Sequence, residues 1–357
     1  MLERVERLRS LFDQAGIEAL YVTNQENRYY LSGFSGTAGA LLISRYESYL
    51  LTDFRYIEQA KRECPEFKVK EVPGAYSDAL LEIIMSAGIS HLGFEGDYLT
   101  YNQFLEIKNK FSGVKLKPLN NFVGELRLCK DANEIRFIEE AVRFADNAFD
   151  RVLPLIRPGI PEREVAVELE YLMRRMGSDG IAFSIIVASG YRSAMPHGVA
   201  SCKLIQQGEL VTIDMGAVCK GYHSDITRTV VIGKPDMMQE EIYNIVLQAQ
   251  IKAISGIKAG VRASDIDHNA RQFIKMKGYG DNFGHGTGHG LGLDIHEGPR
   301  LSSKEDTILK KGMVVTVEPG IYIPGWGGVR IEDTVLVEEN SCRVLTKTPK
   351  EKLMVLL

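Results

Sequence analysis

The sequence predicts an α+β fold in which a smaller α/β domain precedes a larger domain built from two duplicated halves. Its 357 residues are long for a single hydrophobic core, so two domains are expected. Helix-like and strand-like segments alternate up to about residue 120, and the boundary is expected within Pro118–Asp131. We therefore predict an N-terminal α/β domain at residues 1–122 and a second domain at residues 123–357.

The second domain repeats itself, and the repeat predicts its architecture. Two pairs of segments recur at offsets of 101 and 104 residues: RPGI at 157–160 with KAGV at 258–261, and GELVTIDMG at 208–216 with GMVVTVEPG at 312–320. The first pair begins helices that are expected to end at Gly177 and Gly278. Two copies are too few for a solenoid, so they predict two pseudosymmetric halves that face a common cleft.

Hydrophobic periodicity predicts the other elements. In the N-terminal domain these are a helix at 2–15, a strand at 18–23, a hairpin at 38–44 and 49–52, a helix at 54–64, strands at 69–72 and 92–94, and a helix at 101–111. Asp53 and Thr100 are the expected N-caps of the last two helices, and a long helix at 133–156 follows the boundary. Because the N-terminal domain does not gather His, Cys and carboxylates, we expect it to serve as scaffold, to gate substrate access or to contact another subunit.

Composition narrows the class of protein. The net charge of −4 and the scattered Lys and Arg give no reason to expect nucleic acid or an acidic membrane surface as a partner. No apolar run reaches the roughly 18 residues of a membrane span, and the first twenty residues lack the apolar core of a signal peptide. Five widely spaced cysteines without a CxxC pair predict reduced thiols in a cytoplasmic protein.

A run of glycines and histidines and four acidic residues carry the chemistry. Gly284–Gly292 alternates five glycines with His285 and His289, which leaves backbone amides and imidazole rings open to a ligand. Taken alone, this run is equally consistent with a flexible loop. Four acidic residues in strand-like contexts change the interpretation: Asp214, Asp225, Glu318 and Glu332.

The first acid of each half follows an apolar strand. Asp214 ends the strand LVTI, and Glu318 follows VVTV, so each carboxylate must be protonated, paired or bound to a metal. Asp225 and Glu332 stand in similar contexts on the strand that follows. For these two acids an ordinary ion pair is an alternative, Asp225 with Arg228 and Glu332 with Arg330.

Converging carboxylates repel one another, and two divalent ions would remove that penalty and acidify a bridging water. Oxygen ligands with one imidazole favour Mn²⁺, with Co²⁺, Fe²⁺ or Zn²⁺ as alternatives. The sequence has no HExxH motif, and the glycine run lacks the Lys-Ser/Thr ending of a phosphate loop. We therefore predict a two-metal hydrolase.

The remaining functional candidates are histidines and arginines. We expect His296 to donate to a developing oxyanion or to steady the leaving nitrogen, and His197 to contact substrate. Arg300 and Arg330 are candidate anchors for a substrate carboxylate, with ion pairing as the alternative for each. His223 is expected to support Asp225 or to face solvent. Two histidines lack a functional context and are treated as structural: His91 and His268.

Five motifs resemble those of the creatinase/aminopeptidase metallopeptidases, which share the pita-bread fold. They are Ile213-Asp214-Met-Gly, Ser224-Asp225-Ile-Thr-Arg, Gly288-His289-Gly-Leu-Gly, Thr316-Val-Glu318-Pro-Gly and Val329-Arg-Ile-Glu332-Asp. The resemblance covers about residues 125–350, and the preceding region fits the extra domain of the Xaa-Pro branch, prolidase and aminopeptidase P. Pro299-Arg300 matches that branch and argues against a methionine aminopeptidase.

The resemblance implies a role for each ligand. Asp214 and Asp225 would hold one metal, His289 and Glu318 the other, with Asp225 and Glu332 bridging. Glu318 would also move a proton from the bridging water to the leaving imino nitrogen. This complete ligand set argues against creatine hydrolysis, because creatinase is metal-free and lacks it.

Other residues match the family less uniformly. His285, His197 and His296 match its substrate and transition-state histidines. Arg192 departs from the pattern, because many members carry Asn there, so the rim of the substrate site is expected to differ.

The resemblance implies hydrolysis of the Xaa-Pro bond of dipeptides or short peptides, with a metal-bridging hydroxide as nucleophile. We favour a prolidase slightly, on account of the compact N-terminal domain, over an aminopeptidase P acting on longer peptides. A homodimer is implied as well. Two rivals remain: a non-catalytic protein that binds peptide termini with the same fold, and a dinuclear esterase or amidase.

Overall fold

The computed structural model describes all 357 residues and divides into two compact units, residues 1–127 and 128–357. The division falls between Arg127 and Leu128, whereas the boundary predicted from the sequence lies between residues 122 and 123. No helix in either unit combines the length and the apolar character that crossing a membrane requires.

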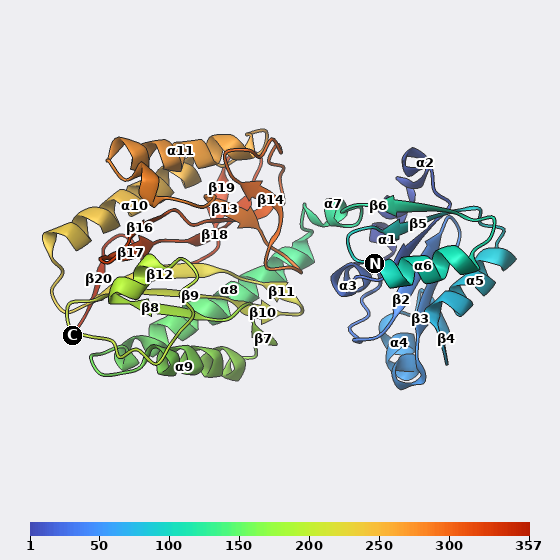
Figure 1. Cartoon of the computed structure of the whole chain (residues 1–357), viewed down its shortest axis with the longest axis horizontal. Coiled ribbons are helices and arrows are strands. Elements are labelled where there is room, and N and C mark those ends of the chain that lie inside the picture. Colours follow the sequence, from blue (N-terminus) through green and yellow to red (C-terminus); the bar gives the residue numbers. More distant parts are fainter. The chain divides into compact units, whose positions relative to one another are not determined.

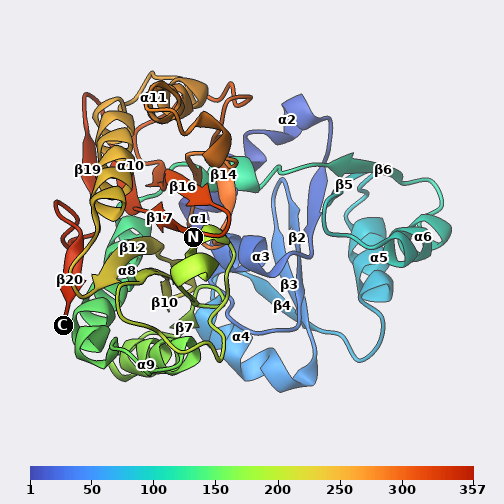
Figure 2. The same cartoon turned by 60° about the vertical axis from the view of Figure 1, so that its left-hand side comes forward.

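Unit 1 is a mixed six-stranded sheet in the order β4-β3-β2-β1-β5-β6, with helices on both faces (Figures 1 and 2). β1 pairs antiparallel with β2 and parallel with β5. The strands are β1 (Ala19–Val22), β2 (Ala40–Ser44), β3 (Ser48–Thr52), β4 (Lys68–Glu71), β5 (His91–Glu95) and β6 (Lys115–Leu119). The helices are α1 (Leu2–Arg9), α2 (Phe12–Ala15), α3 (Gln25–Ser32), α4 (Ile57–Glu63), α5 (Tyr76–Ser86), α6 (Tyr101–Lys110) and α7 (Gly124–Arg127).

Local hydrogen bonds explain where these helices begin and end. The predicted cap at Thr100 is confirmed, since its side chain accepts a hydrogen bond from the Gln103 amide as part of a capping box. The prediction of one helix over residues 2–15 is wrong, because α1 ends at Arg9 and α2 begins at Phe12. The Ser10 hydroxyl donates to the Arg7 carbonyl at 2.7 Å and competes there with the helical hydrogen bonding.

In unit 2, α8 and α9 lie on one side of the strands, and α10 and α11 lie on the other (Figures 1 and 2). The two main sheets run β20-β12-β9-β8 and β14-β13-β15-β18-β19. The helices are α8 (Ala132–Val152), α9 (Glu162–Arg175), α10 (Met237–Ser255) and α11 (Ala263–Met276). The strands of the main sheets are β8 (Ile186–Ser189), β9 (Leu210–Met215), β12 (Ile226–Ile232), β13 (Gly288–Gly290), β14 (Glu297–Leu301), β15 (Val314–Val317), β18 (Asp333–Val337), β19 (Cys342–Val344) and β20 (Met354–Leu356). Shorter strands are β7 (Gly180–Ile181), β10 (Ala217–Cys219), β11 (Tyr222–His223), β16 (Gly320–Ile323) and β17 (Gly327–Arg330).

The predicted duplication is confirmed. The 14-residue helices α9 and α11 begin at corresponding positions of the two halves. The antiparallel pair β9–β12 in the first half likewise corresponds to β15–β18 in the second. The long helix α8 ends at Val152, earlier than predicted, because Pro154 has no N–H to donate to the preceding turn.

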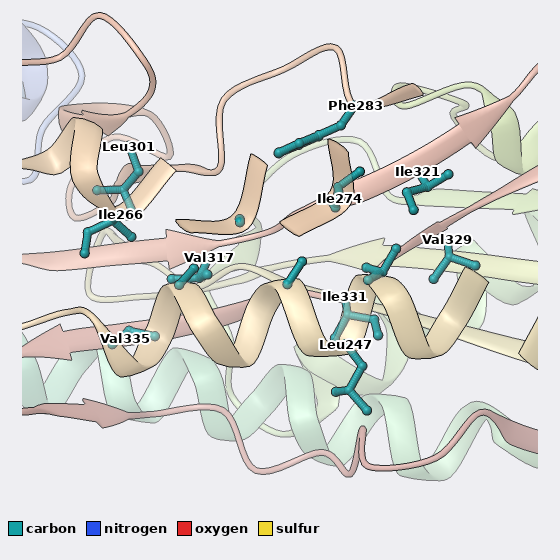
Figure 3. Close-up of a cluster of buried hydrophobic side chains, with 14 of the residues drawn as sticks. Leu247, Ile266, Ile274, Phe283, Leu301, Val317, Ile321, Val329, Ile331 and Val335 are labelled. Carbon is teal, nitrogen blue, oxygen red and sulfur yellow. The ribbon is translucent and has the colours of Figure 1, made fainter. Parts of the chain in front are cut away.

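Each half of unit 2 has its own hydrophobic cluster. The cluster of the second half contains Val317 and Val335 from its sheet together with Ile266 and Ile274 from α11 (Figure 3). The two halves meet where the Glu332 amide donates to the Thr227 carbonyl at 3.1 Å. The ends of β9 and β15 are therefore fixed in packed cores on either side of this junction.

The glycine strand β13 approaches a neighbouring strand too closely to accept a side chain. A Cβ at Gly288 would lie 2.0 Å from the carbonyl oxygen of Thr316, which is backbone and cannot rotate away. A Cβ added at Gly284, four residues earlier, would have no atom within 4 Å.

We predict that Gly288→Ala lowers the free energy of unfolding by about 1–3 kcal/mol, the usual cost of overpacking. Gly284→Ala is the matched control and should leave stability nearly unchanged. Chemical denaturation of the two variants measures the difference. Equal stabilities would contradict the close approach of β13 and β15.

Candidate metal centre

Four of the five predicted ligands, the carboxylates, lie at or next to strand ends of the two main sheets, and the fifth, His289, lies within a strand. Asp214 is the penultimate residue of β9, and His289 is the central residue of β13. Glu318 follows β15 by one residue, so its carboxyl group begins where the buried strand stops. Asp225 and Glu332 are predicted on the following strands, but each lies one residue before its strand, β12 or β18.

Three of these side chains form a compact group. The ligand atoms of Asp225, His289 and Glu332 all lie within 4.8 Å of one another, a spacing that one metal ion can span. His289 Nε2 lies 3.6 Å from Asp225 Oδ2 and 3.5 Å from Glu318 Oε1. The imidazole thus faces two carboxylates.

Carboxylate oxygens without hydrogen-bond partners indicate where a cation would bind. Three buried carboxylate oxygens have no hydrogen-bond partner: Asp214 Oδ1, Asp225 Oδ1 and Glu332 Oε1. Leaving buried oxygens unpaired is costly, and three of them in one cluster need a common explanation. Divalent cations fit, because oxygen-rich sites with one imidazole suit such ions.

The electrostatics support the same conclusion. Burial and then the neighbouring Glu332 raise the pKa of Asp225 well above its usual range. Burial and then Glu318 likewise raise the pKa of Glu332, while burial raises the pKa of Glu318 to about 8. Without a cation, these groups cannot all be ionised at neutral pH. The residues present therefore fit divalent metal ions.

Arg330 is the cation that the protein itself supplies at this cluster. It is 3 % exposed and donates to Asp214 Oδ2 at 2.6 Å. It also donates to Thr227 Oγ1 at 3.1 Å, and that hydroxyl donates to Glu332 Oε2 at 2.7 Å. This geometry favours the ion-pair alternative for Arg330 over the role of substrate anchor.

The two ion pairs offered as alternatives for the second acids are not formed. Arg228 pairs with Asp333 at 2.8 Å instead of Asp225. Arg330 reaches Glu332 only through the Thr227 hydroxyl. Neither second acid is neutralised by a direct arginine contact, which leaves both free to bind a metal.

The histidines differ in exposure and contacts. The rings of His289 and His296 lie 4.3 Å apart, and His296 is exposed beside the carboxylate cluster. His285 Nε2 lies 2.9 Å from the Tyr322 hydroxyl, and burial lowers the pKa of His285 to about 4. Burial also lowers the pKa of His289 to about 4, so its ring is neutral at neutral pH, as a metal ligand must be.

Two other candidates lie near His296, because its pKa is lowered by burial and then by Arg300 and His197. His197 is exposed on the segment between β8 and β9, and Arg300 is exposed on β14 opposite His289. Arg192 forms an ion pair with the fully buried Glu162 and donates to the Val199 carbonyl at 2.9 Å. It therefore braces the segment that carries His197.

Sequence reasoning missed two residues of this network, Tyr322 and Thr227. The Tyr322 hydroxyl accepts a hydrogen bond from Arg330 at 2.9 Å and contacts His285. A tyrosine or threonine on a strand is ordinary in sequence, because both residue types are common in sheets. Only the fold brings Thr227 within reach of Glu332.

A sheet-and-helix domain of two duplicated halves, with carboxylates and one imidazole at their junction, defines a pita-bread metallopeptidase. Residues 136–339 match Metallopeptidase family M24, and residues 4–129 match the Creatinase/Prolidase N-terminal domain. The chain therefore belongs to metallopeptidase family M24, and the predicted fold class is confirmed.

Relatives share this organisation over almost their whole length. The chain is 45 % identical to a Xaa-Pro dipeptidase of Pyrococcus furiosus, covering 99 % of this chain and 100 % of that protein. A solved Xaa-Pro dipeptidase from Bacillus anthracis is 49 % identical, with a TM-score of 0.97 over 99 % of both chains. The X-Pro aminopeptidase from Thermotoga maritima is 41 % identical, with a TM-score of 0.91 over 98 % of this chain and 99 % of the other.

We predict that the metal-free protein loses stability as the pH rises from about 6.5 to 8. A carboxyl group whose pKa is raised on folding keeps its proton only in the native state, so rising pH favours unfolding. Glu318 acts in this window, since burial shifts its pKa from 4.5 to about 8. The lowered pKa values of His285 and His289 act in the opposite sense, but only below the ordinary value of 6.5.

Thermal unfolding of the metal-stripped protein across this pH range measures the effect. Mn²⁺ should raise the melting temperature more at pH 8 than at pH 6.5, because it competes with the retained protons. A melting temperature that stays flat or rises between pH 6.5 and 8 without metal would contradict the raised pKa of Glu318.

Proposed function

We propose that the protein is an Xaa-Pro dipeptidase that requires two divalent metal ions, with Mn²⁺ favoured. The observation that carries the proposal is the intact five-residue ligand set, with three orphaned carboxylate oxygens, in a chain about half identical to Xaa-Pro dipeptidases. Asp214, Asp225, His289, Glu318 and Glu332 would together hold the two ions. When bound, such ions supply charge that acidifies water and polarises the scissile carbonyl.

The protein's own residues would handle the protons and orient the substrate. Proline after the scissile bond makes the leaving group an imino nitrogen, which must gain a proton before it departs. Glu318 would transfer that proton. His296 is exposed next to His289, where it can donate to the developing oxyanion or steady the leaving nitrogen. His197 and His285 contact substrate, and the exposed Arg300 anchors its carboxylate.

An aminopeptidase P is the second candidate, and the likeness to the X-Pro aminopeptidase from Thermotoga maritima favours it. The two activities differ in whether chain can continue beyond the proline. We propose a homodimer in either case. The N-terminal unit would limit the access of longer peptides to the site. A non-catalytic binder of peptide termini is disfavoured, because such a protein would be free to lose carboxylates.

The direct test is hydrolysis of Ala-Pro and Ala-Pro-Ala by the metal-stripped protein before and after Mn²⁺ is returned. We predict metal-dependent cleavage of Ala-Pro with little cleavage of the tripeptide. Glu332→Gln should lower bound metal and activity together, since it removes a carboxylate charge without changing the shape of the side chain.

A matched control is Glu240→Gln, which removes an exposed carboxylate from α10 and should leave both quantities unchanged. Efficient cleavage of Ala-Pro-Ala would favour the aminopeptidase. Metal uptake without cleavage of either peptide would refute both activities.

A further inference from the structure

We propose that Asp267 and Arg271, one turn apart on α11, are positioning residues that hold the glycine-rich segment 284–292 against the metal centre. They would act through the backbone of that segment and set the direction of His285. The inference rests on the proposed function, because it assumes that His285 contacts substrate.

Arg271 directs its guanidinium group at the beginning of the segment. Its Nη1 donates to the Phe283 carbonyl at 2.9 Å, and its Nη2 donates to the His285 carbonyl at 2.7 Å. The guanidinium carbon also lies 4.4 Å from the centre of the Phe283 ring. The chain on both sides of Gly284 is thus attached to a single side chain.

Asp267 binds both the guanidinium group of Arg271 and the part of the segment around Thr287. Its carboxylate is fully buried and makes two contacts of 2.8 Å with Arg271, through Nε and Nη2. The same carboxylate accepts hydrogen bonds from the Thr287 amide at 3.1 Å and the Thr287 hydroxyl at 2.9 Å. The Thr287 carbonyl in turn accepts from the Glu318 amide at 2.7 Å.

The segment needs such support because glycine has little conformational preference of its own. Its histidine has a defined target, since His285 Nε2 lies 2.9 Å from the Tyr322 hydroxyl, which Arg330 also binds. A shift of the His285 carbonyl would turn the ring away from that hydroxyl. Helix α11 packs in the core through Ile266 and Ile274 (Figure 3). Asp267 and Arg271 therefore connect a packed helix to the segment that carries His285.

An exposed ion pair at the same spacing shows the difference. On α9, Glu170 and Arg174 also lie four residues apart, with a 2.9 Å contact, but their side chains are 39 % and 52 % exposed. Such a pair contributes little beyond local helix stability. Asp267 is completely buried, and Arg271 donates hydrogen bonds to the backbone at both ends of Gly284, next to His285.

The test compares Arg271→Lys with the control Arg174→Lys. Lysine keeps the charge but cannot reproduce the planar fork that reaches both carbonyls. We expect Arg271→Lys to lower kcat on Ala-Pro about 10- to 100-fold, as misplacement of a site residue does. Mn²⁺ content should be unchanged, with Tm lower by no more than about 4 °C. Arg174→Lys should match the wild type.

A double-mutant cycle with His285→Ala tests the route of the effect. If Arg271 acts through His285, Arg271→Lys should cause little further loss of kcat once His285 is removed. Fully multiplicative losses in the double variant would overturn the proposed route, as would a wild-type kcat in Arg271→Lys.

Amide hydrogen exchange provides a readout that does not depend on substrate. Peptides covering 283–289 should exchange at least about 10-fold faster in Arg271→Lys, and in Asp267→Asn, than in the wild type. If the wild type cleaves neither prolyl peptide, the proposed function fails while this measurement still tests the support of the segment. Unchanged exchange in both variants would overturn the inference.

Discussion

Four carboxyl groups are buried side by side in this protein, where burial and mutual repulsion both oppose their ionisation. Asp225, Glu318 and Glu332 all have raised pKa values, and burial is the first cause for each. Arg330 offsets the charge of Asp214 by direct contact and reaches Glu332 only through a hydroxyl. One arginine cannot satisfy four acids. The remaining charge is what favours a metal site here over a structural ion-pair network.

The duplicated fold creates this arrangement with simple means. In each half, a buried antiparallel strand ends at or next to an acidic residue. The packing of that strand in the core therefore fixes where the carboxyl group lies. The junction between halves is tied by the Glu332 amide on the Thr227 carbonyl. His289 comes from β13, whose glycines allow the backbone to pass close to β15. Rigid strands thus carry the proposed ligands, which a mobile loop could not hold against the repulsion of their carboxylates.

Much of this could be predicted from the sequence because the signals are local. An apolar strand that ends in an acid, as at Asp214, has few structural explanations, and its recurrence at Glu318 predicts both the duplication and the pairing of acids. The cap at Thr100 is local as well. The break between α1 and α2 was missed, because it depends on one serine hydroxyl whose direction periodicity does not reveal.

The contacts that sequence reasoning could not supply join residues far apart in the chain. Thr227 meets Glu332 across 105 positions, and Tyr322 meets His285 across 37. In the sequence Asp267 and Arg271 look like an ordinary helical ion pair, since nothing local indicates that their polar atoms face the glycine-rich segment. Burial and direction decide such roles, and both are properties of the fold.

The most direct test of the central claim is anomalous diffraction at the manganese edge from crystals of the Mn²⁺-loaded protein. We expect two anomalous peaks within the cluster. Between them, the two peaks should be contacted by all five proposed ligands: Asp214, Asp225, His289, Glu318 and Glu332. Absence of a peak at the cluster, or manganese held by other residues, would contradict the claim.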